Sequence, residues 1–269
     1  MVKVGSSCNR IKAGDNVYGM TDYRVLGSFA EYAIAPEANA ALKPAQLSFI
    51  EAASLPCVGV TGYQALKHKA DIKVGQRVLV LGGAGGTGSF AVQLAAAVGA
   101  SRIVATCSGR NADFVKELGA TECIDYNEKK WHEELAAQDF DVVYDCVGEP
   151  DSYSLSHRIL KPSGRFVSIA SKNSPNISIG SLISSGAQLV GRKLLSFFPS
   201  YPNYSKFRAD TSRHEDLDAI TELVRLGKIK PLVSKTYPLE KCVESFEEVV
   251  AGRTRGKIVF AISAEANQR

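Results

Sequence analysis

The sequence lacks the patterns that mark several classes of protein. Its longest apolar runs, Val78–Leu81 and Phe90–Val98, fall far short of the roughly 18 residues that cross a bilayer. The 32 basic and 28 acidic residues are scattered, so the net charge of +4 forms no patch for nucleic acid or a membrane surface. We therefore expect a small-molecule partner, no nucleic acid and no membrane span.

Cysteine pairs with metal-binding spacing are also lacking. The six cysteines include no C-x-x-C pair, and no histidine lies close enough in sequence to complete a zinc site. The segment Met1–Gly5 has neither the apolar core of a secretory signal nor the Arg- and Ser-rich character of a transit peptide. We expect reduced thiols, no bound metal and a cytoplasmic location, and we assign none of the four histidines a catalytic role.

What the chain does contain is enough apolar sequence for two domains: 45% of its 269 residues are hydrophobic. Up to about residue 56, Gly and Pro interrupt strand-like runs at Asn16–Met20 and Ser28–Ala35. From Val58 to Gly227, apolar runs alternate with segments of helical period, which favours βαβ units and a parallel sheet. The six expected strands are Arg77–Leu81, Arg102–Thr106, Glu122–Asp125, Phe140–Asp145, Arg165–Ile169 and Gln188–Val190.

Helices are expected where apolar residues recur every three to four positions. Phe90, Leu94 and Val98 line one face of the first crossover helix. Later segments of regular pattern are a helix with Leu217, Ile220 and Val224, a strand at 232–237, a helix with Val243, Phe246 and Val250 on one face, and a closing strand at 257–262.

A glycine-rich turn between the first expected strand and helix is the strongest functional signal. Gly83, Gly85 and Gly88 fill a G-x-G-x-x-G pattern, with Gly86 and Thr87 between them. A dinucleotide pyrophosphate needs a tight turn, backbone amides without obstruction by Cβ atoms, and the positive end of a helix dipole. We assign Gly83 to the turn, Gly85 to the close approach and Gly88 to helix packing. The turn therefore predicts dinucleotide binding.

The end of the second expected strand indicates which dinucleotide. Proteins that bind NAD usually place a carboxylate there, on the ribose 2′-hydroxyl. Here no carboxylate follows the strand Arg102–Thr106 until Asp113. Ser108, in contrast, can donate a hydrogen bond, and Arg110 can pair with a phosphate. We therefore expect NADP as the cofactor.

Seven segments, taken together and in order, carry a family resemblance. They are Lys12–Gly19 (K-x-G-D-x-V-Y-G), Gly27–Tyr32 (G-[ST]-[FY]-A-E-Y), Ala52–Leu66 (A-A-x-L-P-x-x-x-x-T-x-Y-x-A-L), Gly83–Gly88, Ile124–Tyr126, Asp145–Gly148 and Gly256–Val259. With them the chain resembles the zinc-independent quinone oxidoreductase branch of the medium-chain dehydrogenase/reductase superfamily, over nearly its whole length.

The resemblance implies an α/β fold: a Rossmann doubly wound parallel sheet of six strands plus a partial GroES-like β-rich catalytic domain. The GroES-like domain would comprise residues 1–57 and 231–269, the Rossmann domain residues 58–230, and NADPH would lie in the cleft between them. Carried over by position, further cofactor-binding residues are Thr61 near the nicotinamide amide, Tyr126 beside the 2′-phosphate, Val147, Gly148 and Ala170 under the ribose and nicotinamide, Phe197 or Phe198 over the nicotinamide ring, and Lys257 at the cofactor or substrate. The resemblance also allows a homodimer.

The sequence departs from the family pattern in two places. Only Met20–Leu26 stands where zinc-dependent relatives carry a cysteine-rich lobe, and Cys57 alone cannot hold a catalytic zinc, which needs about three protein ligands. The family's first strands have no counterpart before Val2, which leaves a fragment, an alternative start or a wrongly placed gene start open.

Hydride transfer from NADPH to a quinone, enone or alkenal suits a site without metal, because a hydrogen-bond donor can stabilise the developing oxygen charge. Two other hypotheses stay open. One is a catalytically silent NADPH-binding sensor or interaction protein, and the weaker one is a zinc-dependent alcohol dehydrogenase.

Overall fold

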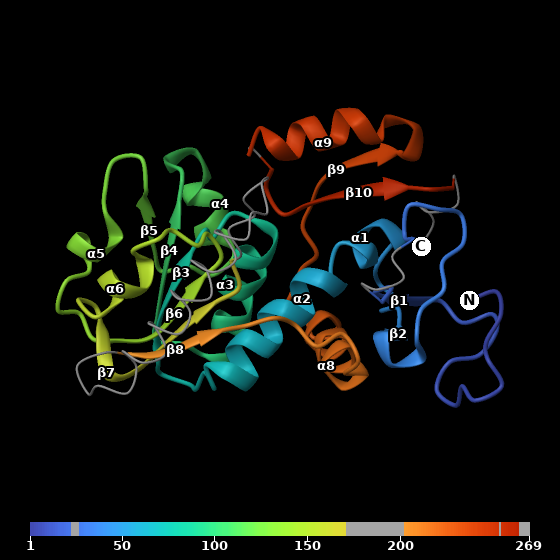
Figure 1. Ribbon diagram of the computed structural model, residues 1–269, viewed down its shortest axis with the longest axis horizontal. Helices are drawn as coiled ribbons and strands as arrows, with labels where there is room; N and C mark the ends of the chain where they lie inside the picture. Colours follow the sequence, from blue (N-terminus) through green and yellow to red (C-terminus); the bar gives the residue numbers. More distant parts are fainter. Residues whose placement is uncertain (23–26, 171–201, 253, 264–269) are drawn as a thin grey trace, which may run out of the picture. The chain divides into compact units, whose positions relative to one another are not determined.

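The chain divides into two compact units in a computed structural model that describes residues 1–22, 27–170, 202–252 and 254–263 (Figure 1). We call residues 64–84 and 91–208 the sheet unit, and residues 1–63, 85–90 and 209–269 the terminal unit. The terminal unit thus includes helices near residues 60 and 220 that the predicted domain limits assigned to the Rossmann domain. Whether the two parts act as cofactor-binding and catalytic domains remains a prediction.

The sheet unit is built on one six-stranded parallel sheet. Its strands are β3 (Arg77–Leu81), β4 (Arg102–Cys107), β5 (Glu122–Asp125), β6 (Phe140–Asp145), β7 (Leu160–Ser168) and β8 (Asn203–Lys206), in the order β5-β4-β3-β6-β7-β8. This is the Rossmann strand order, with its switch point between β3 and β6. The predicted fold class is confirmed.

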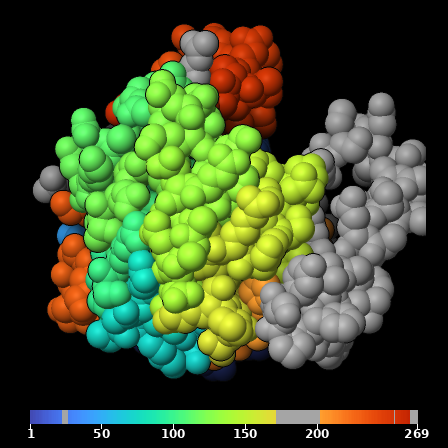
Figure 2. All heavy atoms as spheres, turned by 90° about the vertical axis from the view of Figure 1, so that its left-hand side faces the viewer, coloured from blue at the N-terminus to red at the C-terminus, as the bar shows by residue number. Residues whose placement is uncertain are grey.

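Helices cover both faces of the sheet, which explains why its central strands are apolar on both sides. They are α3 (Gly86–Val98) and α4 (Ala112–Glu117) on one face, and α5 (Trp131–Glu134) and α6 (Ser152–Ser156) on the other (Figure 1). A π-helix at Gln64–Lys69 and a 3-10 turn at Gly109–Asn111 complete the described helices of the unit. Figure 2 shows the face formed by its green and yellow segments, from α4 to β7. Val78–Leu81 are at most 3% exposed, as a doubly covered strand requires.

The terminal unit combines segments from early and late in the sequence. Its strands β1 (Val17–Gly19) and β2 (Ala40–Leu42) pair antiparallel, and β9 (Val233–Pro238) and β10 (Lys257–Ala261) pair parallel around α9 (Cys242–Val250). Its other described helices are α1 (Phe49–Ala53), α2 (Pro56–Tyr63), α8 (His214–Arg225) and 3-10 turns at Glu37–Asn39 and Leu239–Lys241. The predicted helix with Leu217, Ile220 and Val224 is confirmed, since α8 buries all three.

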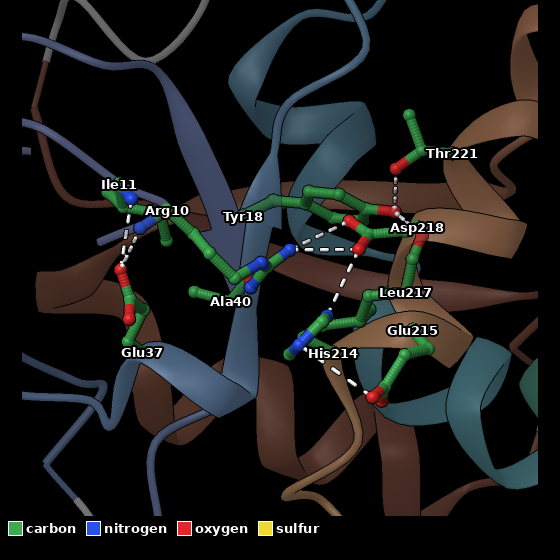
Figure 3. Close-up of polar contacts among 10 residues, drawn as sticks. All are labelled: Arg10, Ile11, Tyr18, Glu37, Ala40, His214, Glu215, Leu217, Asp218 and Thr221. Atoms are coloured by element: carbon green, nitrogen blue, oxygen red, sulfur yellow. Dashed lines mark hydrogen bonds and ion pairs between the residues drawn. The ribbon is translucent and has the colours of Figure 1, made fainter. Parts of the chain in front are cut away.

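Polar contacts join β1 to α8 inside this unit (Figure 3). The buried hydroxyl of Tyr18 donates to the Leu217 carbonyl at 3.1 Å and lies 2.9 Å from the hydroxyl of Thr221. On the exposed side, Arg10 pairs with Asp218 at 2.8 Å. These contacts tie the early segment to a helix two hundred residues later in the chain.

One expected strand is not formed, and the sheet contains a strand that the sequence pattern did not predict. Ser28–Ala35 is not a strand, because no strand among the described residues pairs with it, and Phe29, Tyr32 and Ile34 are 53–84% exposed. The predicted strand Gln188–Val190 lies outside the described residues. The sixth strand of the sheet is β8, where no strand is expected from the sequence pattern.

The predicted helix with Val243, Phe246 and Val250 on one face is α9. The three side chains lie on one side of the helix and are 55–86% exposed. Phe246 contacts Phe29, whose ring in turn meets that of Phe260 at 5.0 Å between centroids.

Candidate functional site

The carboxyl ends of β3 and β6 come together at the switch point of the sheet. The Cys146 amide donates to the carbonyl of Leu81 at 3.2 Å, which continues the pairing beyond β6. A Cβ atom on Gly82 would lie 3.0 Å from the Val147 side chain, so the two chain segments approach as closely as a glycine allows. In open α/β sheets, ligands bind outside this edge.

The tight turn out of β3 is made at Gly82, not at Gly83 as the sequence pattern suggested. Gly82 has a φ of +85°, which favours glycine. Gly83 has another role, because its Cβ atom would lie 2.7 Å from that of Ala105 on β4. Thr106, also on β4, holds the turn: its hydroxyl accepts the Gly82 amide at 3.0 Å and its carbonyl accepts the Gly83 amide at 2.8 Å.

The remaining glycines of the motif lie at the start of α3. Gly85 directly precedes the helix, and Gly86, Thr87 and Gly88 form its first turn. Within the terminal unit, Gly85 forms a parallel bridge with Gly256. The Lys257 side chain crosses the helix start, since a Cβ atom on Gly86 would meet its Cδ at 2.6 Å. Lys257 therefore lies against the phosphate-binding motif that the sequence predicted.

The residues predicted to bind the 2′-phosphate lie on the loop after β4 and directly after β5. Ser108 and Arg110 lie on its turn, and the half-exposed Tyr126 follows β5, beside it. The side-chain amide of Asn111 donates to the Ser108 hydroxyl at 3.1 Å. The structure thus gathers the predicted phosphate-binding residues of the sheet unit at one edge.

A carboxylate does reach this turn, although none follows β4 in the sequence before Asp113. Asp125, at the end of β5, accepts the Gly109 amide at 2.7 Å and both nitrogens of Asn127 at 2.8 and 2.9 Å. Hydrogen bonds from Asn127 and Gly109 hold the pKa of Asp125 below its usual range. Linear spacing could not reveal this contact, because it depends on the pairing of β4 with β5.

A second carboxylate organises the ends of β6 and β7. Asp145 is buried, and its Oδ1 accepts the amides of Val147 and Gly148 at 3.0 and 2.9 Å. Its Oδ2 accepts the Ser168 hydroxyl at 3.0 Å. Gly148 has a φ of +79°, and its Cβ atom would lie 2.5 Å from that of Ala170. Val147, Gly148 and Ala170, all predicted cofactor residues, therefore form one cluster.

The other predicted residues are less informative. Thr61 lies in α2, where its hydroxyl donates to the Cys57 carbonyl at 2.7 Å. Phe197 and Phe198 lie outside the described residues.

Within the described chain, no three His, Cys, Asp or Glu side chains gather closely enough to hold a metal ion, and all six cysteines are free thiols.

A hollow of about 420 Å³ lies elsewhere, in the terminal unit, beside Tyr18 and the segment 33–37. It includes none of the predicted cofactor residues.

No helix in the described ranges is long and apolar enough to cross a membrane.

Comparison with known proteins agrees with this geometry. Residues 118–260 match the zinc-binding dehydrogenase family. A 2-methylene-furan-3-one reductase from Solanum lycopersicum is 36% identical over 97% of this chain and 61% of its own length. A chloroplastic NADPH-dependent alkenal/one oxidoreductase from Arabidopsis thaliana is 31% identical over 96% of this chain and 61% of its own. This chain thus spans less than two thirds of either relative.

A solved structure is similar over a larger share of its length. The quinone oxidoreductase from Coxiella burnetii superposes with a TM-score of 0.83 and 31% identity, over 97% of this chain and 76% of its own. The chain belongs to the medium-chain dehydrogenase/reductase superfamily, in its zinc-independent quinone oxidoreductase-like branch.

Proposed function

We propose that this protein is an oxidoreductase that transfers a hydride from NADPH to a quinone, an enone or an alkenal without a metal ion. The observation that carries the proposal is the glycine turn at the switch point of a Rossmann sheet, with Ser108 and Arg110 on the neighbouring loop. The names of the reductase and the alkenal/one oxidoreductase among its relatives support a conjugated carbonyl substrate and NADPH.

The residues at this edge fit a dinucleotide. The turn at Gly82 directs the chain from β3 into α3, whose first amides and dipole favour a pyrophosphate. Ser108, Arg110 and Tyr126 offer two hydroxyls and a guanidinium to a 2′-phosphate. When bound, NADPH would supply the hydride.

The remaining predicted residues complete the proposal. Val147, Gly148 and Ala170 would support the ribose and nicotinamide, and Gly148 lies so close to Ala170 that a Cβ atom on it would be 2.5 Å from that of Ala170. Gly83, Gly85, Gly86, Thr87 and Gly88 would hold the pyrophosphate, with Thr61, Lys257 and Phe197 or Phe198 near the nicotinamide end. The chain's contribution to catalysis is then orientation of the reactants and exclusion of water.

The reaction takes a hydride from NADPH and a proton from water, and it yields NADP⁺ with the saturated carbonyl compound or the hydroquinone. Purified protein should consume NADPH with a quinone and with an enone, at rates that a chelator leaves unchanged. Activity lost with the chelator would indicate a metal-dependent dehydrogenase. NADPH binding without turnover of either substrate class would favour a silent NADPH-binding protein.

A further inference from the structure

The residues predicted to bind the 2′-phosphate lie on two separate segments. Ser108 and Arg110 belong to the turn after β4, whereas Tyr126 follows β5. A dianionic phosphate bound by all three would require these segments to keep a fixed spacing. Backbone pairing fixes part of this spacing, since the Tyr126 amide donates to the Cys107 carbonyl at 3.2 Å.

The carboxylate of Asp125 links the two segments by side-chain hydrogen bonds. Its Oδ2 accepts the Gly109 amide at 2.7 Å, between Ser108 and Arg110 in sequence. Its Oδ1 accepts the backbone and side-chain nitrogens of Asn127, directly after Tyr126. One side chain thus fixes the backbone beside each predicted phosphate-binding group.

Residue 109 must be glycine for this link to form. A Cβ atom there would lie 2.4 Å from Asp125 Oδ2, well inside van der Waals contact. The three N–H donors also compensate the carboxylate charge, which would otherwise oppose a phosphate nearby.

We propose that Asp125 is a positioning residue for the 2′-phosphate. It favours binding of this phosphate by joining the Ser108–Arg110 turn to the Tyr126–Asn127 segment. The inference rests on the proposed function and names a determinant of its cofactor choice. Asp125 does not touch the phosphate in this scheme. It acts through the Gly109 amide and Asn127.

The experiment compares binding of adenosine 2′,5′-bisphosphate and adenosine 5′-monophosphate, which differ only in the 2′-phosphate, by isothermal titration of the full chain. In Asp125→Ala, the preference for the bisphosphate should fall by about 10-fold, the scale of one charge-assisted hydrogen bond. Affinity for the monophosphate should change little. Glu128→Ala, which removes another carboxylate from the same loop, should keep the wild-type preference.

A second variant tests whether Asp125 acts through Gly109. Gly109→Ala should lower the preference in the wild-type background, because its Cβ atom displaces the carboxylate. In the Asp125→Ala background it should have little further effect, so the two losses should not multiply. Circular dichroism of each variant checks that the sheet is intact.

An unchanged preference in both Asp125→Ala and Gly109→Ala would overturn the proposal. So would a preference that rises in Asp125→Ala, because Asp125 would then act as a repelling charge. Equal affinity of the wild type for the two nucleotides would contradict the NADPH assignment itself, and this result separates failure of the proposed function from failure of the role of Asp125.

Discussion

The Asp145 carboxylate accepts the hydroxyl of Ser168 at 3.0 Å, which joins the end of β6 to the end of β7. The other oxygen of the same carboxylate accepts the two amides of the Val147–Gly148 turn. The two segments that carry Val147, Gly148 and Ala170, the residues predicted to contact the ribose and nicotinamide, are therefore organised by one buried side chain.

Replacing Asp145 should test this arrangement. Asp145→Ala leaves two amides and a hydroxyl without their acceptor, and it should lower the free energy of unfolding by about 1–3 kcal/mol. Asp145→Asn should cost less, because an amide oxygen can accept both backbone N–H groups and its nitrogen can donate to Ser168. Urea unfolding of both variants measures the difference. Equal destabilisation would show that the hydrogen bonds are not what Asp145 contributes.

Gly82→Ala should destabilise the protein and weaken NADPH binding. The φ of +85° costs a residue with a Cβ atom about 1 kcal/mol, and the contact with Val147 at 3.0 Å adds to it. Gly75→Ala is a matched control, because Gly75 has a φ of +80° and nothing within 4 Å of its Cβ position. We expect Gly75→Ala to keep the NADPH dissociation constant. Identical effects of the two substitutions would contradict a special role for the turn at Gly82.

Tyr18→Phe should reduce stability at neutral pH by about 0.5–1.5 kcal/mol through loss of the hydrogen bonds to Leu217 and Thr221. Burial raises the pKa of Tyr18 from 10.0 to about 12, so the folded state favours the neutral phenol. Its contribution is therefore full below pH 10 and decreases as the pH rises toward 12. Thermal unfolding from pH 9 to 12 should show a smaller decline in the variant than in the wild type. A parallel decline would exclude Tyr18 as the titrating group.

Zinc content of the purified protein should be far below one atom per chain. Cys57 is an exposed thiol on α2, and the described residues bring no set of three metal-binding side chains together. Elemental analysis by mass spectrometry measures the ratio. Tightly bound zinc at one per chain, lost in Cys57→Ser, would refute this prediction.

Much of the fold could be predicted from local patterns. Buried parallel strands need apolar residues on both faces, so β3, β4 and β6 appear as apolar runs in the sequence. The strand β8 was missed because Asn203–Lys206 contains no apolar run, and only Tyr204 among its four residues is buried. Ser28–Ala35 shows the opposite error, since an alternating pattern forms a strand only where a partner strand supplies the hydrogen bonds.

The residues of the candidate site could also be predicted only in part from the sequence. The glycine motif and the Ser108–Arg110 loop could be proposed as a binding site from the sequence, because their chemistry depends on residues adjacent in sequence. The contacts of Thr106 and Asp125 could not, since each accepts an amide from a segment that only strand pairing brings near. The bond from Ser168 to Asp145 likewise depends on the pairing of β6 with β7. The cytoplasmic location and the homodimer remain predictions.

The preference for NADPH over NADH tests the central claim most directly. Fluorescence titration of the purified chain should give a dissociation constant for NADPH about 10- to 150-fold below that for NADH, the range of one charge-assisted contact. Arg110→Ala should remove most of this difference by weakening NADPH alone. Equal or tighter binding of NADH by the wild-type protein would contradict the account.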